Sequence, residues 1–343
     1  VKTAEAIKSI LEAVQESGTN ESKNTFEVLS NPEFLAEGTA IKDLEEPDRV
    51  LIGGDDEVAM NSLKDIYLNW IPLEKLIFTN LWSSELSKLT ANAFLAQRIS
   101  SINAIGALCE ETGADVREVA RAIGSDSRIG SKFLDCGPGF GGSCFKKDIL
   151  NLVYLSNHFG LKDVANFWKS VVDLNNWHQN RVSKLIVKKL FGTLSGKRIA
   201  ILGFAFKANT NDTRESAAIH ICKNLLEEGA ILLIHDPKVE QSQMEFDLGS
   251  SPSPEEIDIK NFPNPLLSKR WMKVKDIKDS FINADAVLIL TEWKEYSDIN
   301  WGDAAKLMRK PSWVFDSRSI VNNKEVINAG LNFWRVGDGY NIT

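Results

Sequence analysis

The chain alternates between short apolar runs, which predict strands, and longer segments in which apolar residues recur every three or four positions, which predict helices. The first helical pattern consists of Ala6, Ile7, Ile10, Leu11 and Val14. A polar turn at 17–24 and a strand at 26–29 follow, and then strands at 49–52 and 75–78 flank a further helix. This order predicts the last βα units of a doubly wound sheet.

The middle of the chain is predicted to be helical. A long apolar stripe begins after a capping Ser83 or Ser84 and ends before Gly113, a typical helix stop signal. The stripe is wide enough to be buried on more than one side, which favours a helix that bridges domains or forms a dimer. Two further helices are expected at 115–123 and 163–190.

The last third repeats the alternation of strands and helices. Strands are predicted at 198–202, 231–234, 286–290 and 313–315, with a helix at 216–228 and a surface excursion at 249–266. The order of strand, loop, helix and strand, with Asp236 at the end of the second strand, is a nucleotide-binding arrangement. The glycine pattern of its loop is not GxGxxG. Phe204 is too bulky for a close pyrophosphate approach, so Lys207 and Arg214 are expected to contact phosphate or sugar. Arg318 is expected to point toward the same crevice as Lys207.

Composition and charge narrow the class of protein. With 343 residues, 43% hydrophobic and 25% charged, the chain is long enough for two or three globular domains. A net charge of -7 and the lack of a basic block argue against a nucleic-acid partner. No apolar run approaches the roughly 20 residues that span a bilayer, and no signal peptide opens the sequence, so a cytoplasmic protein is expected.

One cysteine is the candidate nucleophile. The glycines of the run 137–142 let a backbone close on a ligand, and an apolar periodic segment begins directly after Cys144. Cys144 is therefore predicted at a helix N-terminus, where the helix dipole, Lys146 and Lys147 favour the thiolate. Asp148, one turn on, shares its helix face.

The other cysteines are interpreted as structural. Cys109 and Cys222 lie within helical patterns and Cys136 has no neighbouring cation, so each is expected to be a small buried side chain. Four cysteines without a CxxC pair predict neither a zinc site nor a disulfide framework. This usage indicates a reducing compartment and no bound metal.

Two polar groups allow both a structural and a functional interpretation. Glu33 and Glu37 follow the strand predicted at 26–29, at the strand end where open α/β sheets bind ligands, but solvated loop charges are equally consistent. Lys88 and Asn92 lie four residues apart on one face of the long helix. Taken alone, this pair favours a structural role.

Four motifs together resemble the UDP-glucose/GDP-mannose dehydrogenase family. They are Asn31-Pro32-Glu33-Phe34-Leu35-Ala36-Glu37-Gly38, Lys88-Leu89-Thr90-Ala91-Asn92, Gly141-Gly142-Ser143-Cys144-Phe145 with Lys147-Asp148, and Gly203-Phe204-Ala205-Phe206-Lys207 followed by Asp212-Thr213-Arg214-Glu215-Ser216. The likeness spans essentially the whole chain, and the run 31–44 points to the branch that acts on UDP-glucose.

The resemblance implies an α/β fold with two doubly wound Rossmann-like domains, the first incomplete, joined by a long central helix in an α-helical dimerisation domain. Residues 1–81 would form the C-terminal part of an NAD-binding domain. Residues 82–195 would form the central helical domain with the cysteine loop, and residues 196–343 a UDP-sugar-binding domain.

The resemblance also implies a four-electron oxidation of UDP-glucose to UDP-glucuronate, in which two hydrides pass in turn to NAD+. Cys144 would add to the intermediate aldehyde and carry a thiohemiacetal and then a thioester, which water cleaves. Lys88 would stabilise the oxyanion with Asn92 alongside. Asp148 would hold the water or Lys88, and Glu33 would assist hydrolysis of the thioester.

Binding residues follow from the same resemblance. Glu37, Lys147 and Arg214 would lie near the NAD, with Glu37 bordering the nicotinamide. The substrate would be held by Phe34, Leu35, Arg128, Phe133, Gly141, Phe145, Phe206, Lys207 and Arg318. Arg128 would reach across a dimer interface, so a homodimer or higher homo-oligomer is expected.

The chain departs from the family pattern at its start, because the family's strand, GxGxxG turn, helix and ribose-binding acid do not precede Val1. NAD binding by this chain alone is therefore expected to be incomplete. Smaller departures are Asp135-Cys136-Gly137-Pro138 and Ala208-Asn209. Three readings stay open: a UDP-glucose-oxidising member, an enzyme for another nucleotide sugar such as GDP-mannose or UDP-N-acetylmannosamine, or a non-catalytic sugar-nucleotide-binding or dimerisation module.

Overall fold

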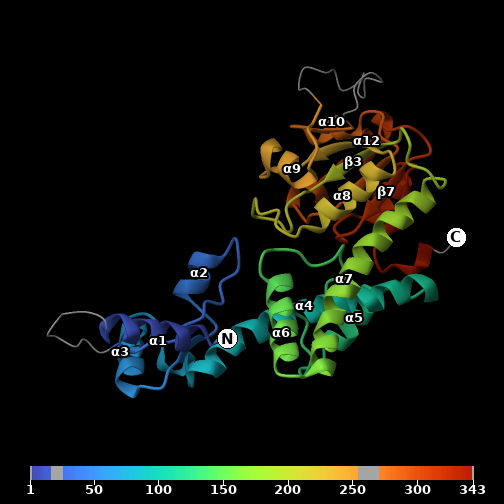
Figure 1. The fold of residues 1–343 in the computed structure, drawn as a ribbon. Helices are drawn as coiled ribbons and strands as arrows, with labels where there is room; N and C mark the ends of the chain where they lie inside the picture. The colour runs from blue at the N-terminus through green and yellow to red at the C-terminus, as the bar shows by residue number, and fades with distance from the viewer. Residues whose placement is uncertain (1, 17–25, 254–269, 342–343) are drawn as a thin grey trace. The chain divides into compact units, whose positions relative to one another are not determined.

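The computed structural model describes residues 2–16, 26–253 and 270–341. The chain forms two compact units, Val1–Ala93 and Phe94–Thr343 (Figure 1). The turn predicted at 17–24 and most of the excursion predicted at 249–266 lie outside the described residues. Among the residues that are described, no helix combines the length and the apolar character needed to cross a membrane.

The first unit contains a parallel βαβ arrangement. Its elements are α1 (Thr3–Glu16), α2 (Ala40–Glu45), β1 (Val50–Gly53), α3 (Glu57–Tyr67), the 3-10 turn η1 (Leu73–Lys75), β2 (Leu76–Thr79) and the start of α4 (Leu81–Thr112). β1 and β2 pair in parallel, with Val50 opposite Leu76. Val50, Ile52, Ile71 and Leu76 form its buried core. The helix predicted at the start of the chain and the two strands predicted around α3 are therefore confirmed.

Two sequence-based expectations in this unit are wrong. Residues 26–29 form no strand, and Ser30 alone makes an isolated antiparallel bridge to Gly53. The run is short, and Pro32, which has no N–H to give to a ladder, follows closely. The long helix α4 is capped by Asn80 and not by Ser83 or Ser84, because the Asn80 side chain accepts a hydrogen bond from the backbone N–H of Ser83 at 2.8 Å.

The second unit begins with helices. α4 ends at Thr112, directly before Gly113, whose φ of 75° suits glycine, and is followed by α5 (Val116–Gly124), α6 (Phe145–His158) and α7 (Lys162–Lys189). The helices predicted at 115–123 and 163–190 are confirmed within about two residues. α6 and α7 pack against each other side by side (Figure 1).

A six-stranded parallel sheet completes the second unit. Its elements are β3 (Arg198–Leu202), α8 (Ala217–Glu227), β4 (Ile231–His235), α9 (Gln241–Leu248), β5 (Trp271–Lys273), α10 (Ile277–Phe281), β6 (Ala286–Ile289), α11 (Lys294–Ser297), α12 (Trp301–Leu307), β7 (Trp313–Asp316), α13 (Asn323–Asn328), β8 (Asn332–Arg335) and the 3-10 turn η3 (Gly339–Asn341). The strand order is β5-β4-β3-β6-β7-β8. This is the strand order of doubly wound, dinucleotide-binding sheets. The order in which successive strands are added changes direction between β3 and β6, and such sheets bind their ligands at this switch point.

The four strands predicted from the sequence for this sheet are all present, at positions close to those expected. The sequence did not predict β5 and β8, nor α9 to α13. Each of these elements has eight residues or fewer, too few for a periodic pattern to stand out. The same is true of α2 in the first unit, with its six residues.

Candidate functional site

The loops that follow β3 and β6 interlock at the switch point of the sheet. The Thr291 hydroxyl after β6 donates a hydrogen bond to the Ala205 carbonyl after β3 at 2.6 Å. A β-carbon added at Gly203 would lie 2.3 Å from that of Thr291, and Gly203 has a φ of 96°. Glycine is therefore required here to let the two loops meet, and not to approach a pyrophosphate.

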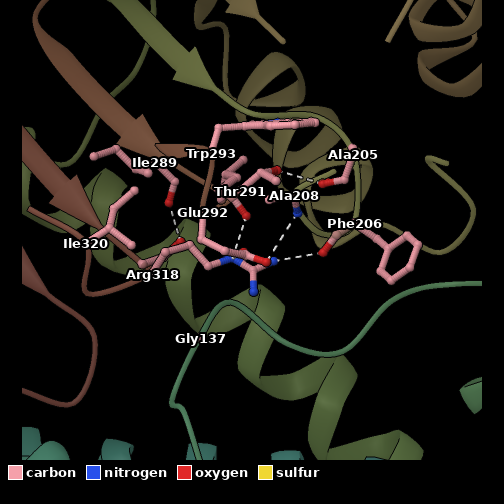
Figure 2. A network of polar contacts seen from close by, with 12 residues as sticks. Gly137, Ala205, Phe206, Ala208, Ile289, Thr291, Glu292, Trp293, Arg318 and Ile320 are labelled. Carbon is pink, nitrogen blue, oxygen red and sulfur yellow. Dashed lines mark hydrogen bonds and ion pairs between the residues drawn. The ribbon is translucent and has the colours of Figure 1, made fainter. Parts of the chain in front are cut away.

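Arg318, just after β7, connects these loops (Figure 2). Its Nη2 donates to the Phe206 carbonyl at 3.0 Å, and its Nε donates to the Leu290 carbonyl at 2.7 Å. Glu292 faces the same guanidinium, with its Oε2 3.1 Å from Nε, while its Oε1 accepts from the backbone N–H of Ala208 at 3.2 Å. The structure thus brings Arg318 to the loop that carries Phe206 and Lys207.

Asp236, at the carboxyl end of β4, organises the same edge. One carboxylate oxygen accepts hydrogen bonds from the backbone N–H groups of Phe204 and Ala205 at 2.7 and 3.0 Å, and from the Trp293 indole at 3.2 Å. The other accepts from the N–H groups of Lys238 and Val239. The Asp236 carboxylate therefore binds backbone N–H groups of the protein itself and fixes the loop after β3.

Cys144 lies at the N-cap position of α6, as predicted. It is half-buried, its sulfur is 3.6 Å from the Ser143 hydroxyl, and its carbonyl accepts from the N–H of Asp148 at 2.9 Å. Asp148 is buried one turn into the helix. Lys146 forms an ion pair with Glu215 at 2.7 Å, and Lys147 is exposed.

The other three cysteines are buried, in agreement with a structural role. Burial raises the pKa of the Cys136 thiol to about 12 and also raises the pKa values of Cys109 and Cys222. Raised pKa values keep these thiols protonated and unreactive at neutral pH. Cys144 is therefore the one cysteine in this chain that combines partial exposure with a helix start.

Gly141 and Gly142 of the cysteine loop, residues 141–144, permit close contact with the segment 214–215. The N–H of Gly142 donates to the Arg214 carbonyl at 2.8 Å. A β-carbon added at Gly141 would lie 2.6 Å from the Glu215 carbonyl oxygen, so a side chain there would force the two segments apart. The sequence motif around Cys144 and the one around Arg214 therefore meet backbone to backbone.

The first unit holds a second group of candidate residues. Lys88 on α4 forms an ion pair with Glu33 at 3.1 Å, and its ammonium lies 5.5 Å from the centre of the Phe34 ring. Burial raises the pKa of the Glu33 carboxyl, but the N–H of Leu35 and Lys88 outweigh it and hold that pKa below its usual value. Lys88 and Glu33 are therefore a charged pair, and the role of Lys88 and Asn92 stays a prediction.

The remaining candidates of the first unit lie next to this pair. Glu37 is partly buried in the same loop as Glu33, with Leu35 between them in the chain. Asn92 is buried one turn after Lys88 on α4. The loop is braced by Asn31, which donates to the Leu51 carbonyl at 2.8 Å and accepts from the Tyr67 hydroxyl at 2.6 Å.

Arg128 and Phe133 lie in a loop after α5. Arg128 is highly exposed and pairs with Asp126 at 2.6 Å. Phe133 has a φ of 62°, which is unusual for a bulky residue. Arg98 on α4 holds the loop between them by donating to the carbonyls of residues 129, 130 and 132.

The candidate residues thus form two groups, one in each compact unit. The first contains Glu33, Phe34, Leu35, Glu37, Lys88 and Asn92, and the second contains Arg128, Phe133, Gly141, Cys144, Phe145, Lys147, Asp148, Phe206, Lys207, Arg214 and Arg318. Among the described residues, no cluster of His, Cys, Asp and Glu is arranged to hold a metal ion.

The residues expected near the dinucleotide have suitable chemistry for it. Lys147 is exposed and Arg214 is largely exposed although it pairs with Asp212 at 2.7 Å, so both cations can face a phosphate or ribose. Glu37 lies in the loop whose bridge from Ser30 to Gly53 joins it to the end of β1. Parallel βαβ units such as β1-α3-β2 bind nucleotides at that end of the strands.

Sequence reasoning missed several polar residues that hold these loops. Asn103, Asn175 and His178 bind the segment before the cysteine loop, Glu292 binds Arg318, and Arg98 binds the loop before Phe133. The one available signal was a polar residue within an otherwise apolar helix stripe. That signal does not reveal what the polar side chain binds, because its partner is a backbone group far away in the sequence.

His178 leads to a prediction about pH and stability. It is fully buried, and burial together with Arg181 lowers its pKa to about 4; Arg181 is itself paired with Glu110 of α4. The unfolded chain takes up a proton below about pH 6.5 while the folded one does not, so stability is lost as pH falls. Between pH 7.5 and 5.0, this group should lower the free energy of unfolding by about 2 kcal/mol.

Urea denaturation at both pH values checks this prediction. The loss on acidification should be smaller in His178→Gln by that amount, whereas His158→Gln, at an exposed position on α6, should behave like the unchanged protein. Equal losses in all three proteins would show that His178 is not held neutral by the fold.

Models of one family match most of the chain. The UDP-glucose/GDP-mannose dehydrogenase NAD binding domain matches residues 1–71, its central domain residues 82–177, and its UDP binding domain residues 200–323. The domain boundaries predicted at 81/82 and 195/196 stay a prediction.

Individual relatives agree with these models. UDP-glucose 6-dehydrogenase of Drosophila melanogaster is 50% identical, in an alignment that covers 100% of this chain and 70% of that protein. The Caenorhabditis elegans UDP-glucose 6-dehydrogenase is 49% identical over 98% of this chain and 68% of its own length. The structure of a UDP-glucose dehydrogenase from Pyrobaculum islandicum matches with a TM-score of 0.76 at 31% identity, covering 96% of this chain and 67% of that one.

Proposed function

The chain belongs to the UDP-glucose/GDP-mannose dehydrogenase family, and on that premise we propose that it oxidises UDP-glucose to UDP-glucuronate through a covalent intermediate on Cys144. It is an NAD-dependent oxidoreductase. The observation that carries the covalent step is the position of Cys144, a half-buried cysteine at the start of α6 while the other three are buried.

The reaction balances as two oxidations and one hydrolysis. NAD+, when bound, accepts the hydride that each oxidation removes from C6, and the first oxidation also releases the proton of the C6 hydroxyl. The Cys144 thiolate forms a C–S bond to the aldehyde carbon, and protonation of the oxygen gives a thiohemiacetal. Loss of the second hydride and of the hydroxyl proton leaves a thioester. Water then forms the C–O bond, the C–S bond breaks, and Cys144 returns as thiolate beside a carboxylate product.

The proposal gives each charged candidate a role. Lys88 stabilises the negative charge that develops on the C6 oxygen, with Asn92 alongside it. Glu33, kept ionised by the N–H of Leu35 and by Lys88, assists the water that cleaves the thioester. Asp148, buried on the face of α6 that carries Cys144, holds the attacking water or Lys88.

The second unit binds the nucleotide part of the substrate. Phe206, Lys207 and Arg318 surround the switch point of the sheet, where doubly wound folds bind their ligands. Gly141 belongs to the cysteine loop, Phe145 begins α6, and Arg128 and Phe133 lie in the loop after α5. Glu37, Lys147 and Arg214 would hold the NAD.

A substrate panel tests the proposed function. Assayed at full length, the enzyme should form NADH with UDP-glucose at a rate well above those with GDP-mannose or UDP-N-acetylmannosamine, and two NADH should appear for each UDP-glucuronate. A preference for another nucleotide sugar would change the substrate but keep the chemistry. Binding of UDP-glucose without any turnover would favour the non-catalytic alternative.

Arg318 gives a prediction about nucleotide binding. Arg318→Gln removes the cation but keeps a hydrogen-bonding side chain, and the affinity for UDP should fall about tenfold or more, the scale for losing a charge-assisted hydrogen bond. Arg309→Gln is the matched control, because Arg309 pairs with Asp285 before β6, at the other end of the strands. Calorimetric titration with UDP measures both. Unchanged UDP affinity in Arg318→Gln would remove Arg318 from the binding site.

A further inference from the structure

Three buried polar side chains hold the segment 137–140, which leads into the cysteine loop and lies in no helix or strand. Asn103 on α4 accepts a hydrogen bond from the N–H of Gly137 at 2.9 Å, and His178 Nε2 on α7 lies 2.8 Å from the Gly137 carbonyl. Asn175 on α7 accepts from the N–H of Phe140 at 2.9 Å and donates to its carbonyl at 3.2 Å. Side chains here replace the backbone partners that a strand would have.

Burying these three polar side chains costs free energy of desolvation, and their hydrogen bonds to the segment 137–140 offset that cost. Asn103, Asn175 and His178 are 1%, 5% and 0% exposed, and an apolar residue would pack at such positions without desolvating a polar group. Among the described residues, Asn103 Nδ2 and His178 Nδ1 have no hydrogen-bond partner. For Asn103 and His178, the contact that offsets this cost is the one to Gly137.

The segment is also closely packed between its anchors. A β-carbon added at Gly139 would lie 2.9 Å from Asn175 Oδ1, and one added at Gly137 would lie 3.5 Å from Arg318 Nη1. Figure 2 shows Gly137 beside the Arg318 guanidinium. The backbone that these three side chains hold is therefore in contact with the nucleotide-binding edge as well as with α7.

Three residues separate Cys144 from Phe140, and two of them are glycine. Glycine leaves a backbone free to sample many conformations, so a loop of this composition does not fix its own thiol. The contacts of Gly142 with Arg214 and of Phe140 with Asn175 hold the loop from two directions. Displacing a reacting group by about 1 Å can lower a rate about 10²-fold.

We propose that Asn103, Asn175 and His178 are positioning residues that fix the 137–140 backbone and thereby the place of the Cys144 thiol. The effect on rate rests on the proposed function. The effect on loop order does not, and it can be measured without substrate.

Hydrogen exchange tests the loop directly. Asn175→Ala and His178→Leu should each speed exchange of the amides in the peptide 137–146 about tenfold or more, because each leaves backbone groups without their partner. His178→Gln retains an N–H donor at similar reach and should restore slow exchange. Asn180→Ala is the control on the same helix, since Asn180 binds His220 and Asn224 and not the loop.

Steady-state kinetics test the consequence for catalysis. The kcat for UDP-glucose oxidation should fall about 10- to 100-fold in Asn175→Ala and His178→Leu, with less than about a threefold change in the Kd for UDP. His178→Gln and Asn180→Ala should keep kcat near that of the unchanged enzyme. A role confined to stability would lower the melting temperature and leave kcat per folded molecule and loop exchange unchanged, which would overturn the proposal.

Hydrogen exchange and kinetics together distinguish a failure of the positioning role from a failure of the proposed function. If the unchanged enzyme does not oxidise UDP-glucose, the proposed function fails while hydrogen exchange still decides whether the three residues hold the loop. If the enzyme is active but neither exchange nor kcat responds to Asn175→Ala and His178→Leu, the positioning role is wrong and the proposed function stands.

Discussion

Replacing Cys144 by serine should lower UDP-glucuronate formation by about 10³-fold or more, the scale for removing the nucleophile of a covalent mechanism. A serine hydroxyl at the start of α6 has no general base assigned to it and stays protonated near neutral pH. The aldehyde would then lack the partner that carries it to the thioester. The first oxidation can persist slowly, so the variant should form at most one NADH per sugar and little acid.

Control variants make this result specific. Cys109→Ser and Cys136→Ser remove buried thiols whose pKa values are raised by burial, so acid formation per folded molecule should stay near that of the unchanged enzyme. Product analysis by liquid chromatography distinguishes acid from aldehyde. Undiminished acid formation by Cys144→Ser would refute the covalent mechanism.

Chemical labelling gives an independent view of the same thiol. Iodoacetamide should modify Cys144 faster than the three buried cysteines near neutral pH, because access and thiolate character control alkylation. UDP-glucose should slow that modification. Peptide mapping after a short exposure measures the rate at each cysteine.

Replacing Lys88 by alanine should lower kcat by about 10²-fold or more, the scale for losing one positioned group that stabilises a developing oxyanion. The loss should come with little change in folding, because Lys88 and Glu33 are both partly solvent-accessible, and surface ion pairs contribute about 0–1 kcal/mol to stability. Lys64→Ala is a suitable control, since Lys64 pairs with Asp65 on α3.

The two possible roles of Lys88 give opposite results. If Lys88 only braced the loop of Glu33, thermal stability would fall while kcat per folded molecule stayed near normal. Measuring the melting temperature and kcat of Lys88→Ala side by side therefore decides between them.

The sequence predicted the elements that have clear periodicity or end signals. β3 and β4 follow from apolar runs of four residues at 199–202 and 231–234, and α8 follows from a helical pattern capped by Ser216, whose side chain accepts from the N–H of Ala218. Residues 26–29 have the composition of a strand, but strand pairing depends on neighbours distant in the chain, and here only Ser30 finds one. Short elements such as β5, with three residues, leave no pattern to detect.

Candidate residues that lie within one motif could be found from the sequence. Cys144, with Lys147 and Asp148 beside it, and the pair of Glu33 and Lys88 all belong to motifs visible in the sequence. The supporting residues were not predictable, because Asn175 and His178 bind backbone 35 and 41 residues away and Glu292 meets Arg318 from another strand. Such partners are set by the packing of α7 and the order of the sheet strands.

The central claim, a covalent intermediate on Cys144, is tested most directly by trapping it. Glu33→Gln should slow thioester hydrolysis, so acid quenching of this variant during incubation with UDP-glucose and NAD+ should capture the acylated enzyme. Peptide mass mapping should then place the oxidised sugar nucleotide on the peptide that contains Cys144, in a form that hydroxylamine removes. A stalled enzyme in which Cys144 is unmodified, or in which the sugar is attached to another residue, would contradict the account.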